Sequence, residues 1–284
     1  MTTILSCTDG SSYARSVYEL TAWAALRLHA SVHVLHVLEP QTDTAALADL
    51  SGAIGVDAQA KLTDEIVALE EAKARVAQVR ARAILTDAKQ HLATAGVTHV
   101  HAEATHGELV ESIEHFDATA DLVVIGKRGE QADLARGHLG GNLQRVIRGC
   151  HHPVLVASQT FVPIERFLLA YDGSPSVLKA VDFVLQSPLL KGLHCHILRA
   201  GKVDDKATYY LEETAGKLRA AGFSVTSQST AGAPEEVIAA AVQEQRINLL
   251  VMGAYGHSRI RAFIIGSTTT SLVRTVPVPV LMFR

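Results

Sequence analysis

Apolar residues follow two spacings along this chain. Some form short continuous runs, such as Ile4–Cys7, Leu122–Gly126 and Leu249–Gly253, which are typical of strands covered on both faces. Others recur every three or four positions, as from Ala14 to Leu28, and this spacing predicts amphipathic helices between the strands. Because strands alternate with helices throughout, the pattern predicts an α/β fold built on doubly wound parallel sheets.

Three sequence blocks occur twice in the same order, so the chain contains an internal repeat. The blocks pair Ile4–Ser12 with Leu168–Ser176, Asp121–Gly129 with Asn248–Gly256, and Gly140–Ala157 with Gly266–Phe283. The boundary is the SQTFVP segment, where an apolar strand ends before a proline. The repeat therefore predicts two tandem domains, residues 1–158 and 163–284, each with a five-stranded parallel sheet.

The first half is longer because it carries a segment, about Thr42–Ala95, that has no counterpart in the second half. We expect this insertion to be mostly helical, with a solvated charged face from Asp64 to Arg82. Its apolar start, Ala45–Val56, could pack on its own domain or line a pocket for an apolar ligand. The sequence leaves both alternatives open.

Each half begins with a strand that ends in Asp-Gly-Ser. Ser11 and Ser174 are predicted to cap the helices that follow, and Pro175 suits the first helical position. Asp9 and Asp172 could accept hydrogen bonds from a ribose or a base, or could bond the N–H groups of their own turns. Ligands in such folds bind beyond the carboxyl ends of the strands, where both aspartates are expected.

The composition limits the classes of partner and the cellular setting that we expect for this chain. Lys and Arg total 26 and Asp and Glu total 29, a net charge of −3, which argues against a nucleic-acid partner and a polybasic membrane patch. No apolar run is long enough for a membrane span. The three cysteines are odd in number and form no CxxC pair, so we expect a reducing, cytoplasmic setting without a disulfide framework.

The strongest local signal is a glycine-rich segment in the second half, between an apolar strand and a helix. Glycines let the backbone approach a ligand closely, and a helix N-terminus offers free N–H groups to phosphate. The candidate residues are Gly253, Gly256, Arg259, Gly266, Ser267 and Thr268. Turn glycines without a ligand are the alternative reading, but the position at the predicted cleft favours phosphate.

Together these blocks resemble the universal stress protein family in its tandem form. Gly253 and Gly256, then nine residues, then Gly266-Ser267 match the family's ATP-binding pattern G-2x-G-9x-G-(S/T). The resemblance implies the Rossmann-like fold of adenine nucleotide alpha hydrolases and binding of ATP, with magnesium. It further implies that Asp172 contacts the nucleoside and that a backbone group on the second strand meets adenine. Ungapped alignment of Leu198 with Val37 gives Leu198 this role.

The family also pairs its modules through their last strands. The resemblance therefore implies an internal pseudo-dimer of the two halves, and it leaves a homodimer open.

The first half departs from this pattern. Gly126 and Gly129 are present, but ten residues separate Gly129 from Gly140, and Gly141 stands where the second half has Ser267. The first half therefore lacks this hydroxyl donor. A hydrogen bond to a charged group contributes ~1.5–3 kcal/mol, so its absence favours nucleotide binding in the second half. Lys127 and Arg128 could still attract an anion in the first half.

No Walker loop, nucleophile elbow, HExxH pair or acid–base dyad is present, so the sequence predicts a nucleotide-controlled stress-response protein with little or no hydrolysis and no catalytic residues. A slow ATP hydrolase or phosphotransferase is the alternative. Among 14 histidines, alternating pairs such as His99 and His101 could supply two zinc ligands. Because spacing provides no third ligand, the sequence does not favour a metal site.

Overall fold

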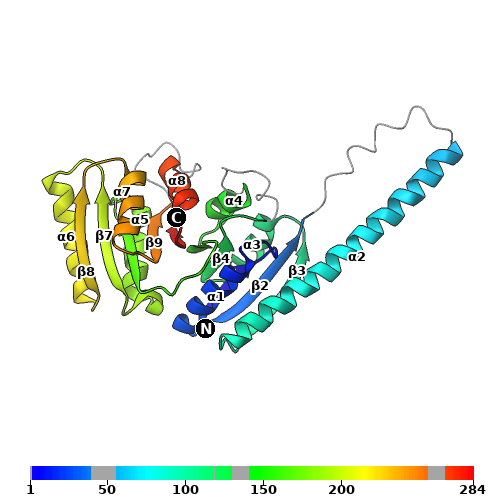
Figure 1. Ribbon diagram of the computed structural model, residues 1–284, viewed down its shortest axis with the longest axis horizontal. Helices are drawn as coiled ribbons and strands as arrows, with labels where there is room; N and C mark the ends of the chain where they lie inside the picture. Colours follow the sequence, from blue (N-terminus) through cyan, green and yellow to red (C-terminus); the bar gives the residue numbers. More distant parts are fainter. Residues whose placement is uncertain (1, 40–55, 118, 130–140, 255–265) are drawn as a thin grey trace.

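The computed structural model describes residues 2–39, 56–117, 119–129, 141–254 and 266–284. Strands and helices alternate in both halves, as the hydrophobic pattern predicts (Figure 1). In the first half the elements are β1 (Thr3–Cys7), α1 (Ala14–Leu28), β2 (Ser31–Leu38), α2 (Val56–Thr94), β3 (Val100–His106), α3 (Leu109–Asp117), β4 (Leu122–Gly126), α4 (Gly141–Gly149) and β5 (Val154–Ala157).

The second half follows the same order without a counterpart of the long extension of α2. Its elements are β6 (Arg166–Ala170), α5 (Pro175–Gln186), a 3₁₀ turn (Pro188–Leu190), β7 (His194–Ala200), α6 (Asp205–Ala220), β8 (Ser224–Thr230), α7 (Pro234–Glu244), β9 (Leu249–Gly253), α8 (Ser267–Thr275) and β10 (Val280–Phe283).

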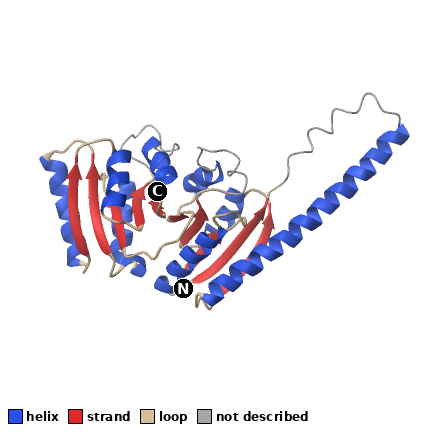
Figure 2. Ribbon diagram, viewed as in Figure 1, coloured by secondary structure: helices blue, strands red, loops and turns tan. Residues whose placement is uncertain are grey.

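All ten strands form one sheet, in the order β3-β2-β1-β4-β5-β10-β9-β6-β7-β8. Within each half all neighbouring strands are parallel, so the doubly wound α/β prediction is confirmed. The halves meet at β5 and β10, which pair antiparallel with Leu281 opposite Leu155. The two five-stranded parallel sheets are thus joined edge to edge into one continuous sheet (Figure 2).

Each face of the sheet carries its own apolar core, because successive strand residues point to opposite faces. Ile4 packs with Val17 of α1 and Leu92 of α2, whereas its neighbour Leu5 packs with Ile113 of α3 on the other face. Both cores extend without interruption from the first half into the second. Covering both faces with helices explains the continuous apolar runs in the sequence.

Helix α2 extends well beyond the sheet (Figure 1). Only its C-terminal part packs on the core, through residues such as Ala81 and Leu92. Val67 and Val76, nearer its start, are exposed, and pairs such as Lys73–Glu70 lie on its surface. The solvated charged face predicted for this segment is confirmed, while its apolar start at residues 45–55 lies outside the described residues.

Of the two predicted N-caps, Ser174 is confirmed and Ser11 is wrong. Ser174 caps α5, since its hydroxyl accepts from the Val177 N–H at 3.4 Å, and Pro175 is the first helical residue. In the first half the cap is Tyr13, without a side-chain bond, so Ser11 as N-cap is wrong. Ser11 instead uses its carbonyl to accept from the Ala14 N–H in the turn before the helix.

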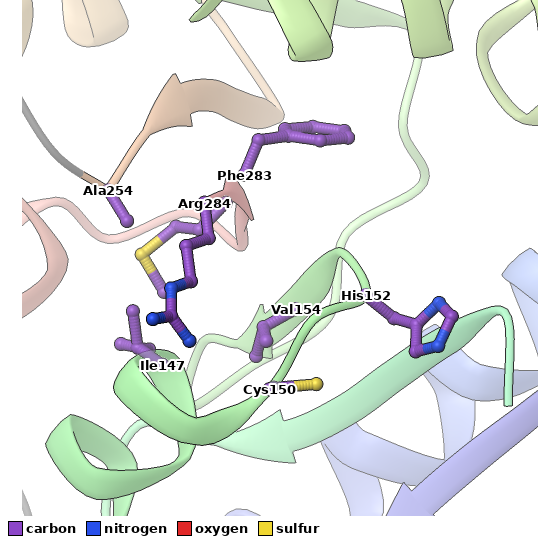
Figure 3. Close-up of a pocket in the computed structure, with 8 residues that line it drawn as sticks. Ile147, Cys150, His152, Val154, Ala254, Phe283 and Arg284 are labelled. Atoms are coloured by element: carbon purple, nitrogen blue, oxygen red, sulfur yellow. The ribbon is translucent and has the colours of Figure 1, made fainter. Parts of the chain in front are cut away.

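Two cationic side chains of the first half donate hydrogen bonds to backbone carbonyls of the second half. Lys127 donates to the carbonyls of Val276 and Val278, and Arg27 donates to the Leu189 carbonyl. Figure 3 shows the seam beside β5 and β10, where Ile147, Cys150 and Val154 lie near Ala254 and Arg284, while the Phe283 ring points away from them. The hollow that these residues line is too small for a water molecule, so they form a packing contact.

All three cysteines are buried, and none of them forms a disulfide. Burial raises the pKa of Cys7 and of Cys195 to about 12, so both thiols stay protonated at neutral pH. Among the described residues, no helix combines the length and the apolarity that crossing a bilayer requires.

Candidate functional site

The Asp-Gly turn of the second half lies at the carboxyl edge of the sheet, directly after β6. The Asp172 carboxylate accepts from the Ser174 N–H at 2.9 Å, so the turn-stabilising alternative is realised. Gly173 has φ of +74°, a conformation that favours glycine. A Cβ added at Gly173 would meet no described heavy atom within 4 Å, and the glycine itself is half-buried.

Gly253 ends β9 and packs directly on the start of α5. A Cβ at this position would lie 2.3 Å from Ser176 Oγ and 3.1 Å from the Val177 nitrogen. Glycine is therefore needed here for close packing of strand on helix. The same contact brings the end of β9 beside the Asp172 turn, which precedes Ser176 by only four residues.

Helix α8 begins next to this edge. Its N-cap is Gly266, with no capping side chain among the described residues, and Thr269 Oγ1 donates to the Ala254 carbonyl at 3.2 Å. Ser267 is exposed and Thr268 half-buried. The N–H groups of the first turn and the positive end of the helix dipole are thus held beside β9, an arrangement suited to an anion.

The strand registers correct the residue chosen for adenine. Leu35 pairs with Cys7, and Leu198 pairs with Ala170, the residue two before Asp172 as Cys7 is two before Asp9. Leu198 therefore corresponds to Leu35, and the ungapped alignment with Val37 is wrong. Leu198 is buried, and its carbonyl accepts from the Tyr171 N–H at 2.8 Å.

The position that corresponds to Val37 is Ala200, which sequence reasoning missed. Val37 pairs with Thr105 and Ala200 with Thr230, each near the carboxyl end of its strand. The signal was available, because Ala200 follows Asp172 by the same number of residues as Val37 follows Asp9.

The equivalent turn of the first half has a helix beside it. Asp9 accepts from the Ser11 N–H at 3.0 Å, and Gly10 has nearly the same left-handed φ, +72°, as Gly173. A Cβ at Gly10 would lie 2.7 Å from Ile84 Cδ1, however, because α2 packs over this turn. Ile84 therefore lies beside the Gly10 turn, at a place where the second half has no described atom, although Gly10 itself is exposed and Gly173 half-buried.

Side chains of the first half itself also lie against its glycine segment. A Cβ at Gly126 would lie 3.1 Å from the Tyr13 Cβ, and one at Gly129 would lie 2.8 Å from Asp9 Oδ2. Lys127, expected to attract an anion, instead donates to two carbonyls of the second half. Its burial, with Arg128 nearby, lowers its pKa to about 8, so the expectation for Lys127 is wrong.

The model of the universal stress protein family matches this chain twice, over residues 1–158 and 163–284. The chain belongs to the universal stress protein family. A universal stress protein from Synechocystis sp. is 39% identical over 100% of both chains. Among solved structures, a universal stress protein from Archaeoglobus fulgidus DSM 4304 superposes with a TM-score of 0.72 at 23% identity, covering 99% of this chain and 96% of that one.

A second solved structure, a putative universal stress protein from Pseudomonas aeruginosa UCBPP-PA14, gives a TM-score of 0.63 at 15% identity, covering 99% of this chain and 92% of that one. At these identities the structural likeness supports the fold. It agrees with the Rossmann-like architecture implied by the family resemblance.

The structure brings together part of the predicted universal stress protein site. Asp172, Gly253, Gly266, Ser267 and Thr268 gather around the ends of β6 and β9 and the start of α8. Gly256 and Arg259, and Gly140 in the first half, lie outside the described residues. Gly141 begins α4.

Proposed function

We propose that this universal stress protein binds ATP, with magnesium, at the carboxyl edge of its second half, and acts as a nucleotide-controlled stress-response protein. The observation that carries the proposal is the difference between two equivalent turns: the Ile84 side chain lies where a Cβ at Gly10 would point, whereas no described atom lies within 4 Å of that place at Gly173. A nucleotide needs space beside the turn, and among the described residues the second half leaves more of it at this position.

The N-terminus of α8 supplies the phosphate contacts in this proposal. Its first-turn N–H groups and the exposed Ser267 hydroxyl point to an edge where Gly266 adds no side chain. Asp172 would contact the nucleoside. The strand position that the family resemblance assigns to adenine falls on Ala200 rather than Leu198, because of the register correction above.

Little or no hydrolysis is part of the proposal. A phosphotransferase needs a carboxylate for magnesium and a base near the γ-phosphate. Asp172, the obvious acid at this edge, already accepts a hydrogen bond from the Ser174 N–H. We expect turnover of ATP well below about 1 per second.

We infer further that the two halves work as an internal pair. Support comes from the β5–β10 pairing and from Lys127 and Arg27, which donate across the contact. Three buried thiols without a disulfide suit a reducing compartment such as the cytoplasm.

Calorimetric titration with Mg-ATP tests the proposal, using the wild type and Gly266→Val. A Cβ at Gly266 would meet only Thr269 Oγ1, at 3.7 Å, among the described residues, so the fold has room for a side chain. We expect one site per chain in the wild type and at least ~10-fold weaker binding in the variant, since a side chain keeps phosphate from the N–H groups.

Equal thermal midpoints without ligand would show that the variant is folded. Absence of heat from the wild type, or equal affinity in both proteins, contradicts the proposal.

A further inference from the structure

A cluster of metal-binding side chain types lies at the opposite end of the sheet from the nucleotide edge. His33 on β2 is directly opposite His101 on β3, and Glu103 lies two residues further along β3. The neighbouring residues Val32, Val34 and Val100 pack into the core beneath α2, so the cluster faces the other way, towards α3. Two strands far apart in the sequence thus bring three candidate ligands to one face.

The three ligand atoms are close enough for a single ion. His33 Nε2 is 2.9 Å from Glu103 Oε1, His101 Nε2 is 3.8 Å from Glu103 Oε2, and all three ligand atoms lie within 4.8 Å of one another. Zinc bonds of ~2.0–2.2 Å in a tetrahedron place ligand atoms roughly 3.3 Å apart. The two spacings from the imidazoles to the Glu103 carboxylate, 2.9 and 3.8 Å, lie on either side of that value, so small side-chain rotations would bring the three groups to one ion.

The surroundings fix one ligand and leave access for an ion. The Phe116 ring of α3 packs on the His33 ring, with centroids 4.5 Å apart, while the His101 side chain is 67% exposed. His33 and His101 also line an open hollow of about 310 Å³ at the amino ends of the strands. A positioned imidazole beside a movable one is a workable entry site for a metal ion.

The second half provides an internal comparison. By strand register, His196 corresponds to His33, Thr226 to His101 and Gln228 to Glu103. His196 Nδ1 bonds the Thr226 hydroxyl at 2.9 Å. The repeat retains one histidine, but a hydroxyl and an amide replace the other imidazole and the carboxylate, so a metal-binding set exists only in the first of these two matched triads.

We propose that His33, His101 and Glu103 bind a divalent transition metal, with zinc as the best fit to two imidazoles and one carboxylate. Three protein ligands leave one coordination position for water or an exogenous ligand. The ion would also tie β3, the outermost strand of the sheet, to β2. This site is separate from the proposed nucleotide edge and does not depend on it.

The test is zinc binding by the full-length, tag-free protein, measured by calorimetry with Zn²⁺ alone and by elemental analysis after dialysis. Loss of a hydrogen bond that supports a ligand typically weakens metal binding 10–100-fold, so removal of a ligand should cost at least ~10-fold. We expect His101→Ala and Glu103→Gln each to show this loss. The exposed His101 can be removed without disturbing the core.

His194→Ala is the matched control, because it removes an imidazole from the edge of the second half, where His194 bonds Ser224 and Thr226. It should bind one Zn²⁺ per chain as the wild type does. A second readout is thermal: Zn²⁺ should raise the unfolding midpoint of the wild type and of His194→Ala, and leave His101→Ala unchanged. Failure of the wild type to bind Zn²⁺, or unchanged affinity in either ligand variant, overturns the proposal.

Discussion

The two halves of this chain share a backbone plan and differ at both ends of their sheets. Strand order and register are the same in each, down to the pairing of His33 with His101 and of His196 with Thr226. At the carboxyl edge, a Cβ at Gly10 would meet Ile84, whereas one at Gly173 would meet no described atom within 4 Å. At the amino end the first half has the metal-binding residue types.

This difference indicates which positions of a repeated domain can change without disturbing its fold. The strand residues pack into two cores that run through both halves, so a change there would disturb the whole sheet. Residues at strand ends and in the connecting segments make fewer such contacts. The connection between the second and third strands of each half shows the result, since its helix has 39 residues in α2 and 16 in α6 while the strand register is the same.

The largest effect should come from Lys127, whose counterpart in the second half is Ala254. Lys127→Met leaves the Val276 and Val278 carbonyls without their donor, so we expect a loss of about 1–3 kcal/mol in unfolding free energy. Urea unfolding measures it, with Arg128→Met as control. A loss no larger than the control's would mean that this cation does not hold the halves together.

The same lysine predicts a pH dependence. Burial lowers its pKa to about 8 from an ordinary value of 10.5, so between these values the unfolded chain binds the proton more tightly than the folded chain. Stability gained from this group therefore rises with pH across that window. The deficit of Lys127→Met relative to the wild type should widen from pH 8 to pH 10; a constant deficit would count against the lowered pKa.

A second comparison uses the two aspartates. Asp172→Ala and Asp9→Ala each remove one turn hydrogen bond, to Ser174 and Ser11 respectively, so their structural costs should match. If nucleotide binds only in the second half, Asp172→Ala should weaken Mg-ATP about ten- to hundredfold and Asp9→Ala should not. Equal losses of affinity would place nucleotide in both halves.

The smallest difference should appear between the two paired glycines. Gly10→Ala and Gly173→Ala place a side chain in the same left-handed conformation, at a cost of roughly 1–2 kcal/mol each. Gly10→Ala should cost about 1 kcal/mol more, because its Cβ also meets Ile84. Thermal or urea unfolding of the two variants would reveal the excess, and Ile84→Ala should abolish it.

Helix capping was predicted correctly where adjacent residues determine it. Ser174 followed by Pro175 predicted the cap of α5 correctly, because the proline sets the first helical φ. Ser11 lacks a following proline, and its helix begins three residues later. The adenine position failed for a different reason: aligning Leu198 with Val37 was two residues out of step with the strand register, which pairs Leu198 with Ala170 as it pairs Leu35 with Cys7.

The sequence by itself determined the repeat, the α/β class, the glycine segment and the family, since periodicity and spacing are local properties of the chain. Only the tertiary structure decided that α2 lies beside the first Asp-Gly turn, that Lys127 serves the contact between halves, and that Glu103 joins His33 and His101. Each of these contacts joins residues distant in sequence, and their distances depend on packing and strand register, which no local spacing specifies.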